Sequence, residues 1–150
     1  MLIYKAGRLY AGHASFSLPD NCGVNDAPFA TLPNGINLKS KDGVYLIDVN
    51  FEFGPGGAQR SLEDSMILGD FSNVRIKRRF YSEQTGWSAE YRGELYSYFE
   101  VRFDAPTGLT DYNSNEVNIF RVIVTAPRDT NFRTIRHLPE ITELLNSFRP

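Results

Sequence analysis

The sequence has one cysteine and two histidines among its 150 residues. A single cysteine, Cys22, cannot close a disulfide within the chain, and a Cys-based zinc cluster needs several cysteines. His13 and His137 have no cysteine or acidic residue at a metal-ligand spacing, so we expect surface or capping roles for both. No acid–base pair or nucleophile–base arrangement stands out either. We therefore assign no metal ligand, no cofactor and no catalytic residue, and we favour a protein without enzyme activity.

A long hydrophobic run and a strong net charge are absent as well. No stretch approaches the roughly 18 consecutive apolar residues of a membrane-spanning helix, and residues 1–12 lack the apolar core of a signal peptide. We expect a soluble chain and take the cytoplasm as its default location, while a secreted or lipid-anchored form from which a leader was removed stays open. The net charge of -2 gives no overall attraction to nucleic acid or to an anionic membrane, so we expect neither as a partner.

The sequence is rich in alternation of apolar and polar residues, which is typical of half-buried strands. Every second residue over 45–53 is apolar, ending at Phe53, and the run over 95–103 begins with Leu95 and places its charged residues on the opposite face. The predicted strands are 14–18, 36–40, 44–53, 74–81, 87–92, 95–103 and 117–126, with a shorter segment over 3–10 that Gly7 interrupts.

Turn residues and burial arrange these strands. Asp42-Gly43 supplies the positive φ of a tight hairpin between 36–40 and 44–53. The strand over 117–126 is apolar on both faces, so we expect it in the centre of the sheet. Residues 23–35 and 105–116 are predicted loops.

Two helices are predicted beside the sheet. Ser61 can cap a short helix that begins at Leu62 and ends at Gly69. Pro139 suits the first turn of a C-terminal helix whose apolar residues over 141–148 fall at i, i+3, i+4 and i+7. The chain therefore predicts one α+β domain over residues 1–150. It has a single antiparallel sheet of about six or seven strands, with the C-terminal helix packed on one face and the Ser61 helix on or near the other.

The densest positive cluster lies in the strand over 74–81. It consists of Arg75, Lys77, Arg78 and Arg79, of which the three at odd positions share one face, and Tyr81 lies nearby in the sequence. One interpretation is ordinary cross-strand pairing with acidic residues of the following strands, such as Glu90 and Glu100. The other is a docking surface for an acidic protein partner, because tyrosine and arginine are favoured at interfaces. Nucleic acid fits less well, since the neighbouring acidic residues would repel phosphates.

Five phrases of the sequence follow one another in an order that resembles the PsbP-like superfamily, which includes many small bacterial relatives. They are Phe16-Ser17-Leu18-Pro19, the hairpin around Gly43, Ser61-Leu62-Glu63-Asp64, Gly86-Trp87-Ser88-Ala89-Glu90-Tyr91, and the last helix with Ser147-Phe148-Arg149. The resemblance covers most of the chain. It implies an antiparallel sheet flanked by helices that acts by binding proteins, usually without enzyme activity. None of the phrases is a catalytic signature, so no functional residue is carried over.

Two functions remain open from the sequence. The first is a non-catalytic binding module with a protein partner. The alternative is a protein that binds, or acts on, a small apolar ligand in a cavity between the sheet and a helix, lined by the strand aromatics. An enclosed apolar cavity of roughly several hundred Å³ would favour the alternative.

Overall fold

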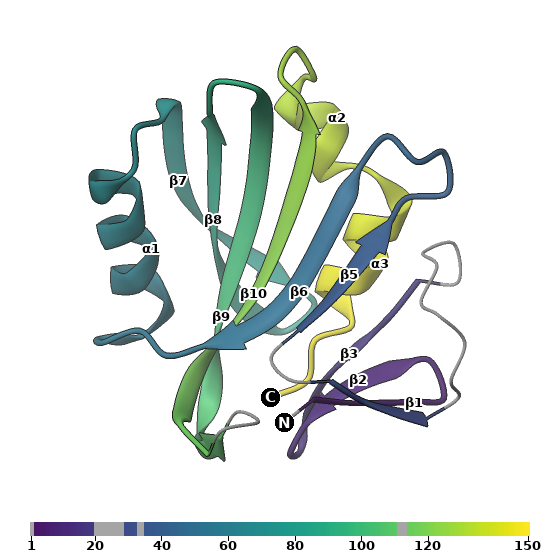
Figure 1. Cartoon of the computed structure of the whole chain (residues 1–150). Coiled ribbons are helices and arrows are strands. Elements are labelled where there is room, and N and C mark those ends of the chain that lie inside the picture. The colour runs from purple at the N-terminus through teal and green to yellow at the C-terminus, as the bar shows by residue number, and fades with distance from the viewer. Residues whose placement is uncertain (1, 20–28, 33–34, 111–113) are drawn as a thin grey trace.

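Figure 1 shows the chain as a computed structural model, which describes residues 2–19, 29–32, 35–110 and 114–150. Its strands are β1 (Leu2–Lys5), β2 (Arg8–Ala11), β3 (Ala14–Ser17), β4 (Phe29–Leu32), β5 (Gly35–Lys39), β6 (Leu46–Glu52), β7 (Ser72–Tyr81), β8 (Gln84–Arg92), β9 (Tyr96–Thr110) and β10 (Glu116–Pro127). They form a six-stranded main sheet in the order β5-β6-β10-β9-β8-β7 and a four-stranded second sheet in the order β3-β2-β1-β4. Each strand pair is antiparallel. The predicted α+β class and antiparallel main sheet are confirmed, and β10 lies inside the sheet as expected.

Three helices accompany the sheets: α1 (Gly57–Leu68), α2 (Phe132–Arg136) and α3 (Pro139–Asn146). Leu62 and Met66 of α1 pack against Ala89 and Tyr91 of β8. The apolar residues of α3 belong to a separate core cluster on the other face of the main sheet. Figure 1 shows α1 and α3 on opposite sides of this sheet. The predicted placement of the two helices is therefore confirmed.

The prediction of a single sheet is wrong, because the N-terminal residues build a sheet of their own. Gly7, with φ of 80°, and Ala6, with φ of 50°, make the tight turn between β1 and β2, so Gly7 joins two strands rather than interrupting one. β4 lies in the predicted loop 23–35 and pairs with β1. Residues 20–28 and 33–34 of this region lie outside the described residues. Long-range pairing with β1 decides the structure of β4, and local composition does not reveal it.

The predicted loop over 105–116 is also largely strand. β9 continues to Thr110 and β10 begins at Glu116, with Val117 paired to Leu109 and Glu116 to Thr110. Residues 111–113 lie outside the described residues. The ladder continues past an irregularity between Val117 and Ile119, so pairing with the neighbouring strand overrides the turn residues of this segment.

Helix α1 begins five residues before the predicted start. Gly56, with φ of 80°, is its N-cap, and the backbone N–H of Ala58 donates to Oδ1 of Asp104 at 2.8 Å. Asp104 comes from β9, so a carboxylate distant in sequence satisfies the first turn. Ser61 lies inside the helix and is not its cap. The predicted end at Gly69 is confirmed, since Gly69 is the C-cap.

The core between the main sheet and α3 is built from aromatic rings. The rings of Phe103 and Phe148 stack with centroids 4.4 Å apart, and Phe16 meets Phe120 at 5.3 Å. Phe148 lies just beyond α3, where the backbones of Ser15 and Arg149 exchange hydrogen bonds of 2.8 and 2.9 Å. The last residues of the chain are therefore tied to the second sheet.

Two residues that the alternation assigned to the core face are exposed. Phe53 is 55% exposed and Leu95 is 71% exposed. β6 ends at Glu52 and β9 begins at Tyr96, so both residues lie just outside their strands and the alternation no longer fixes where they point.

Removing the C-terminal anchor tests the packing of this end of the chain. We expect Phe148→Ala and Leu145→Ala each to lower the free energy of unfolding by about 2 to 5 kcal/mol, because both side chains are buried and each change leaves a cavity. Urea unfolding measures the effect. Leu68→Ala, at an exposed position of α1, is the control and should cost less than about 0.5 kcal/mol. Losses below about 0.5 kcal/mol for both core changes would contradict the docking of this segment.

Candidate functional site

The basic residues predicted on one face of 74–81 do share a face in β7. The cross-strand register places Arg75 opposite Glu90 and Lys77 opposite Ser88. Among the described residues, β7 is the last strand of the main sheet and has β8 as its one neighbour there. Arg75 and Lys77 are exposed, and Arg79 is partly buried. The structure therefore brings the three basic residues together at a free sheet edge.

Tyr81 has a different role from the three basic residues. It is half-buried, and its ring meets Phe103 of the core edge-on at 5.8 Å. Burial raises the pKa of Tyr81 to about 12. Tyr81 therefore anchors the end of β7 to the core, and its phenol is neutral across the physiological pH range.

Glu90 of β8 connects the basic strand to α2. Its side chain is 7% exposed, and its Oε1 lies 3.6 Å from Nη2 of Arg79 and 3.1 Å from Nε of Arg136. The contact with Arg136 is an ion pair without the alignment of a hydrogen bond. Arg79 also donates from Nε to Oγ of Ser88 at 3.1 Å. Arg79 therefore pairs with a carboxylate of the neighbouring strand, although the residue directly opposite it is Gly86 and Glu90 lies opposite Arg75.

Two open pockets adjoin along β7 and α2, and we call them together the β7–α2 groove. The larger, of about 600 Å³, is lined by Asn73, Val74, Arg75, Glu90, Arg92, Asp129, Asn131, Phe132, Arg133 and Arg136. The smaller, of about 340 Å³, is lined by Lys77, Arg78, Arg79, Phe80, Tyr81, Arg136 and His137. Arg136 lines both. Basic side chains clearly outnumber the acidic Glu90 and Asp129 among these residues, so the groove presents positive charge.

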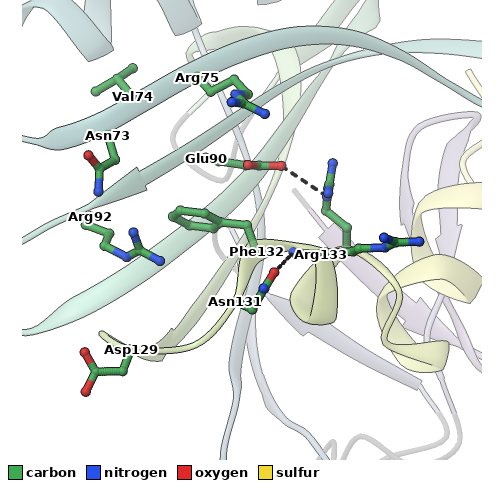
Figure 2. Close-up of a pocket in the computed structure, with 10 residues that line it drawn as sticks. Asn73, Val74, Arg75, Glu90, Arg92, Asp129, Asn131, Phe132 and Arg133 are labelled. Carbon is green, nitrogen blue, oxygen red and sulfur yellow. Dashed lines mark hydrogen bonds and ion pairs between the residues drawn. The ribbon is translucent and has the colours of Figure 1, made fainter.

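The α2 side of the groove is held in place by local contacts. Figure 2 shows Arg75, Arg92 and Arg133 around Glu90 and Phe132. The side chain of Asn131 caps α2 by accepting from the backbone N–H of Arg133 at 2.8 Å. The guanidinium of Arg92 lies 4.6 Å from the centroid of the Phe132 ring, and its Nε donates to the carbonyl of Arg128 at 3.1 Å. These contacts fix one wall of the groove.

The α2 wall of the groove was not predicted from the sequence. A helix of five residues carries too little periodicity to be recognised, although Asn131 is a usable cap signal. Arg133 and Arg136, three apart, are the residues that such a cap would have pointed to. His137 is the C-cap of α2, and its Nδ1 lies 2.7 Å from the carbonyl oxygen of Arg133, which confirms the predicted capping role.

The opposite face of the main sheet carries a buried ionic network. Glu100 is 0% exposed, and its Oε2 accepts from Nε of Arg121 at 2.7 Å and from Nε of Arg102 at 3.0 Å. The hydroxyl of Tyr91 donates to Oε1 of Glu100 at 2.7 Å. We call Glu100, Arg102, Arg121 and Tyr91 the Glu100 network. The expectation that Glu100 faces the basic strand is wrong, because its register partner is Ala89, which points to the α1 face.

Helix α1 covers part of this network. Nη1 of Arg102 donates to Oγ of Ser61 at 2.7 Å, and its Nη2 donates to Oγ of Ser65 at 3.2 Å. An open cleft of about 430 Å³ lies between α1 and the sheet. Its lining residues are Glu52, Ser65, Met66, Leu68, Gly69, Phe71, Tyr91, Glu100, Arg102 and Arg121. The arrangement fixes α1 through charge-assisted hydrogen bonds.

The charges of the network stabilise one another. Burial alone would raise the pKa of Glu100, but the attraction and hydrogen bonds of Arg121 and Arg102 outweigh it and hold the pKa below its usual value. Burial also raises the pKa of Tyr91 strongly, and the negative charge of Glu100 adds to this effect. Glu100 is therefore ionised and Tyr91 neutral at physiological pH, and the network serves as a fixed scaffold rather than an acid–base pair.

Comparisons with known proteins do not identify a family for this chain. No family model matches the chain, and no curated protein matches it. The resemblance to the PsbP-like superfamily therefore stays a prediction. Within residues 2–19, 29–32, 35–110 and 114–150, no three His, Cys, Asp or Glu side chains are grouped to hold a metal ion. In the same residues, no helix has the length and apolar content needed to cross a membrane.

Neutralising the buried carboxylate tests the scaffold role. We expect Glu100→Gln to lower the free energy of unfolding at neutral pH by about 3 to 5 kcal/mol, because it removes the buried counter-charge that Arg102 and Arg121 share and leaves Arg102 with Glu52 as its ion-pair partner. Urea unfolding measures the loss. Glu83→Gln, in the exposed turn after β7, is the matched control and should change stability by less than about 0.5 kcal/mol. Equal stability of both variants would contradict the assignment.

The lowered pKa of Glu100 also predicts that the stability difference between wild type and Glu100→Gln depends on pH. The pKa of Glu100 is lower in the folded than in the unfolded chain, so its stabilisation is fully present above the usual value of 4.5 and is lost as the pH falls through the folded value. The difference in unfolding free energy between wild type and Glu100→Gln should therefore be largest near neutral pH and narrow on acidification. Urea unfolding at a series of pH values measures this difference. A difference that stays constant down to about pH 3 would rule out this origin.

Proposed function

We propose that this protein is a non-catalytic binding module whose β7–α2 groove docks an acidic protein partner. The observation that carries the proposal is the segregation of charge. The whole chain has a net charge of -2, yet the two adjoining pockets of the groove gather the side chains of Arg75, Lys77, Arg79, Arg92, Arg133 and Arg136 against two acidic side chains. Such a local excess of one sign attracts a partner of the opposite sign and speeds its association.

The basic residues of the groove differ in their contacts within the chain. Arg79 and Arg136 share the carboxylate of Glu90, so they serve chiefly to hold the two walls together. Arg75, Lys77 and Arg133 make no ion pair with the described residues of the chain. These three side chains are therefore available to contact carboxylates of a partner. The planar guanidinium of arginine suits such contacts because it can bind a carboxylate with two hydrogen bonds.

The sequence resemblance points in the same direction. A PsbP-like protein would be expected to act by binding other proteins, which agrees with a module that has a charged docking groove and no assigned catalytic residue. Membership of the PsbP-like superfamily is therefore part of the proposal.

A small apolar ligand is the weaker candidate. The space between the main sheet and α3 is occupied by core side chains such as Phe103, Phe120 and Phe148. The cleft between α1 and the sheet is open and is lined by four charged residues of β6, β9 and β10. An apolar ligand placed against these groups would remove them from water without offering hydrogen bonds in return. We therefore favour the protein partner.

Removing the two exposed basic residues tests the proposal. We expect Arg75→Ser combined with Lys77→Ser to weaken binding of a fluorescent oligo-glutamate peptide about tenfold, equivalent to about 1.4 kcal/mol. The effect should be larger at about 0.05 M than at about 0.3 M salt, because salt screens exposed charges. Thermal stability should change by less than about 1 kcal/mol per residue replaced. Fluorescence anisotropy measures the affinity.

The matched control is Lys39→Ser combined with Lys41→Ser. These residues are exposed, one at the end of β5 and one just after it, at the other edge of the main sheet, and the change in net charge is the same. Affinity should stay within about twofold of wild type, which is about 0.4 kcal/mol. An equal loss in both variants would mean that the peptide senses only net charge, and the proposal would then be wrong.

A further inference from the structure

We infer that the acidic segment of the partner binds as an additional β-strand on the free edge of β7. This inference rests on the proposed function and specifies how the same groove is used. Strand addition gives affinity through main-chain hydrogen bonds and specificity through alternate side chains.

The edge of β7 has the length and accessibility that strand addition needs. β7 contains 10 residues and pairs with β8 without a shift from Arg75 to Tyr81. On its other side the main sheet ends, and most of the strand is exposed. Such an edge presents backbone N–H and C=O groups that another chain can pair with.

Charge identifies the occupant of this edge. A second copy of the chain pairing antiparallel along β7 would bring its own Arg75, Lys77 and Arg79 against the same residues, and like charges opposite one another are destabilising. An acidic strand turns this repulsion into attraction. The edge is therefore built to reject a second copy and to accept a partner with carboxylates.

Strand geometry fixes the spacing of the acidic residues. Arg75, Lys77 and Arg79 are two residues apart, which places successive side chains about 6.6 to 6.8 Å from one another along the strand. Side chains of an added strand on the same face recur at the same interval. The partner segment should therefore carry Asp or Glu at every second position.

The other face of β7 indicates which residues of the partner segment should stand between its acidic residues. Ile76, Arg78 and Phe80 lie there, with Phe80 67% exposed and the guanidinium of Arg78 5.6 Å from its ring centroid. β-branched residues suit positions beside this partly apolar face. The expected recognition element is an extended segment in which acidic and β-branched residues alternate.

A basic edge strand has a second explanation, since lysine and arginine also protect sheet edges from aggregation. Four synthetic peptides of the length of β7 decide between the two accounts when titrated into the full chain. The first alternates Glu with Thr, and the second has the same composition with all Glu residues together. The third and fourth are the alternating peptide N-methylated at its Glu amides or at its Thr amides.

The alternating peptide should bind at least about tenfold more tightly than its rearranged isomer. In an edge strand, alternate residues direct their backbone groups toward the neighbour, so only one of the two N-methylated peptides should lose binding. Hydrogen exchange should slow at amides of β7 when the alternating peptide is bound. Anisotropy and hydrogen-exchange mass spectrometry supply these readouts.

Other results overturn the inference in distinguishable ways. Equal binding of both isomers with no effect of N-methylation, but with loss in Arg75→Ser/Lys77→Ser, would reject strand addition and keep charge-based docking. Failure of every acidic peptide to bind even at low salt would remove the proposed function as well. If that failure came with self-association of the double variant, the basic edge would be assigned to protection against aggregation.

Discussion

The ion pairs of Glu90 hold the β7–α2 groove together. Its carboxylate, on β8, contacts Arg79 of the edge strand and Arg136 of α2, so a single buried charge links both walls of the β7–α2 groove. Glu90 offsets the charge of these two arginines, whereas Arg75, Lys77 and Arg133 are exposed and make no ion pair with the described residues. A carboxylate buried at this point needs partners to offset its desolvation, and it thereby fixes where the arginines lie.

The two faces of the main sheet use charge in different ways. On the α1 side, Glu100 forms ion pairs with Arg102 and Arg121, so each of these three charges has a partner and the network stabilises the fold. On the α2 side, the positive charges exceed the negative ones and the surface is open. Because of this contrast, we propose the groove as the site for an acidic partner and regard the Glu100 network as part of the scaffold. The Glu100 network and the groove both include polar residues that alternate with apolar ones along strands. They differ because α1 covers part of the network, whereas the groove is open.

The sequence alone reveals part of this picture. Alternation correctly predicted the common face of Arg75, Lys77 and Arg79, and turn and helix signals predicted most of the main sheet and α3. The sequence pattern does not show that α1 covers the face of β9 that carries Glu100. The prediction that Glu100 lies across from the basic residues of β7 was therefore wrong. The N-cap role of Asp104, the pairing of β4 with β1 and the α2 wall all depend on contacts between residues distant in the chain or on elements too short for periodicity. Local pattern specifies which residues share a face, and tertiary packing decides what that face meets.

The central claim is that the β7–α2 groove is the surface that recognises acidic protein segments. The most direct measurement is a map of amide chemical-shift changes in the isotope-labelled chain during titration with an acidic peptide. The account predicts that the changes are confined to β7, its neighbours in β8 and the residues of α2, and that they saturate with one affinity. Changes centred on α1 and the Glu100 network, or spread evenly over the surface, would contradict it.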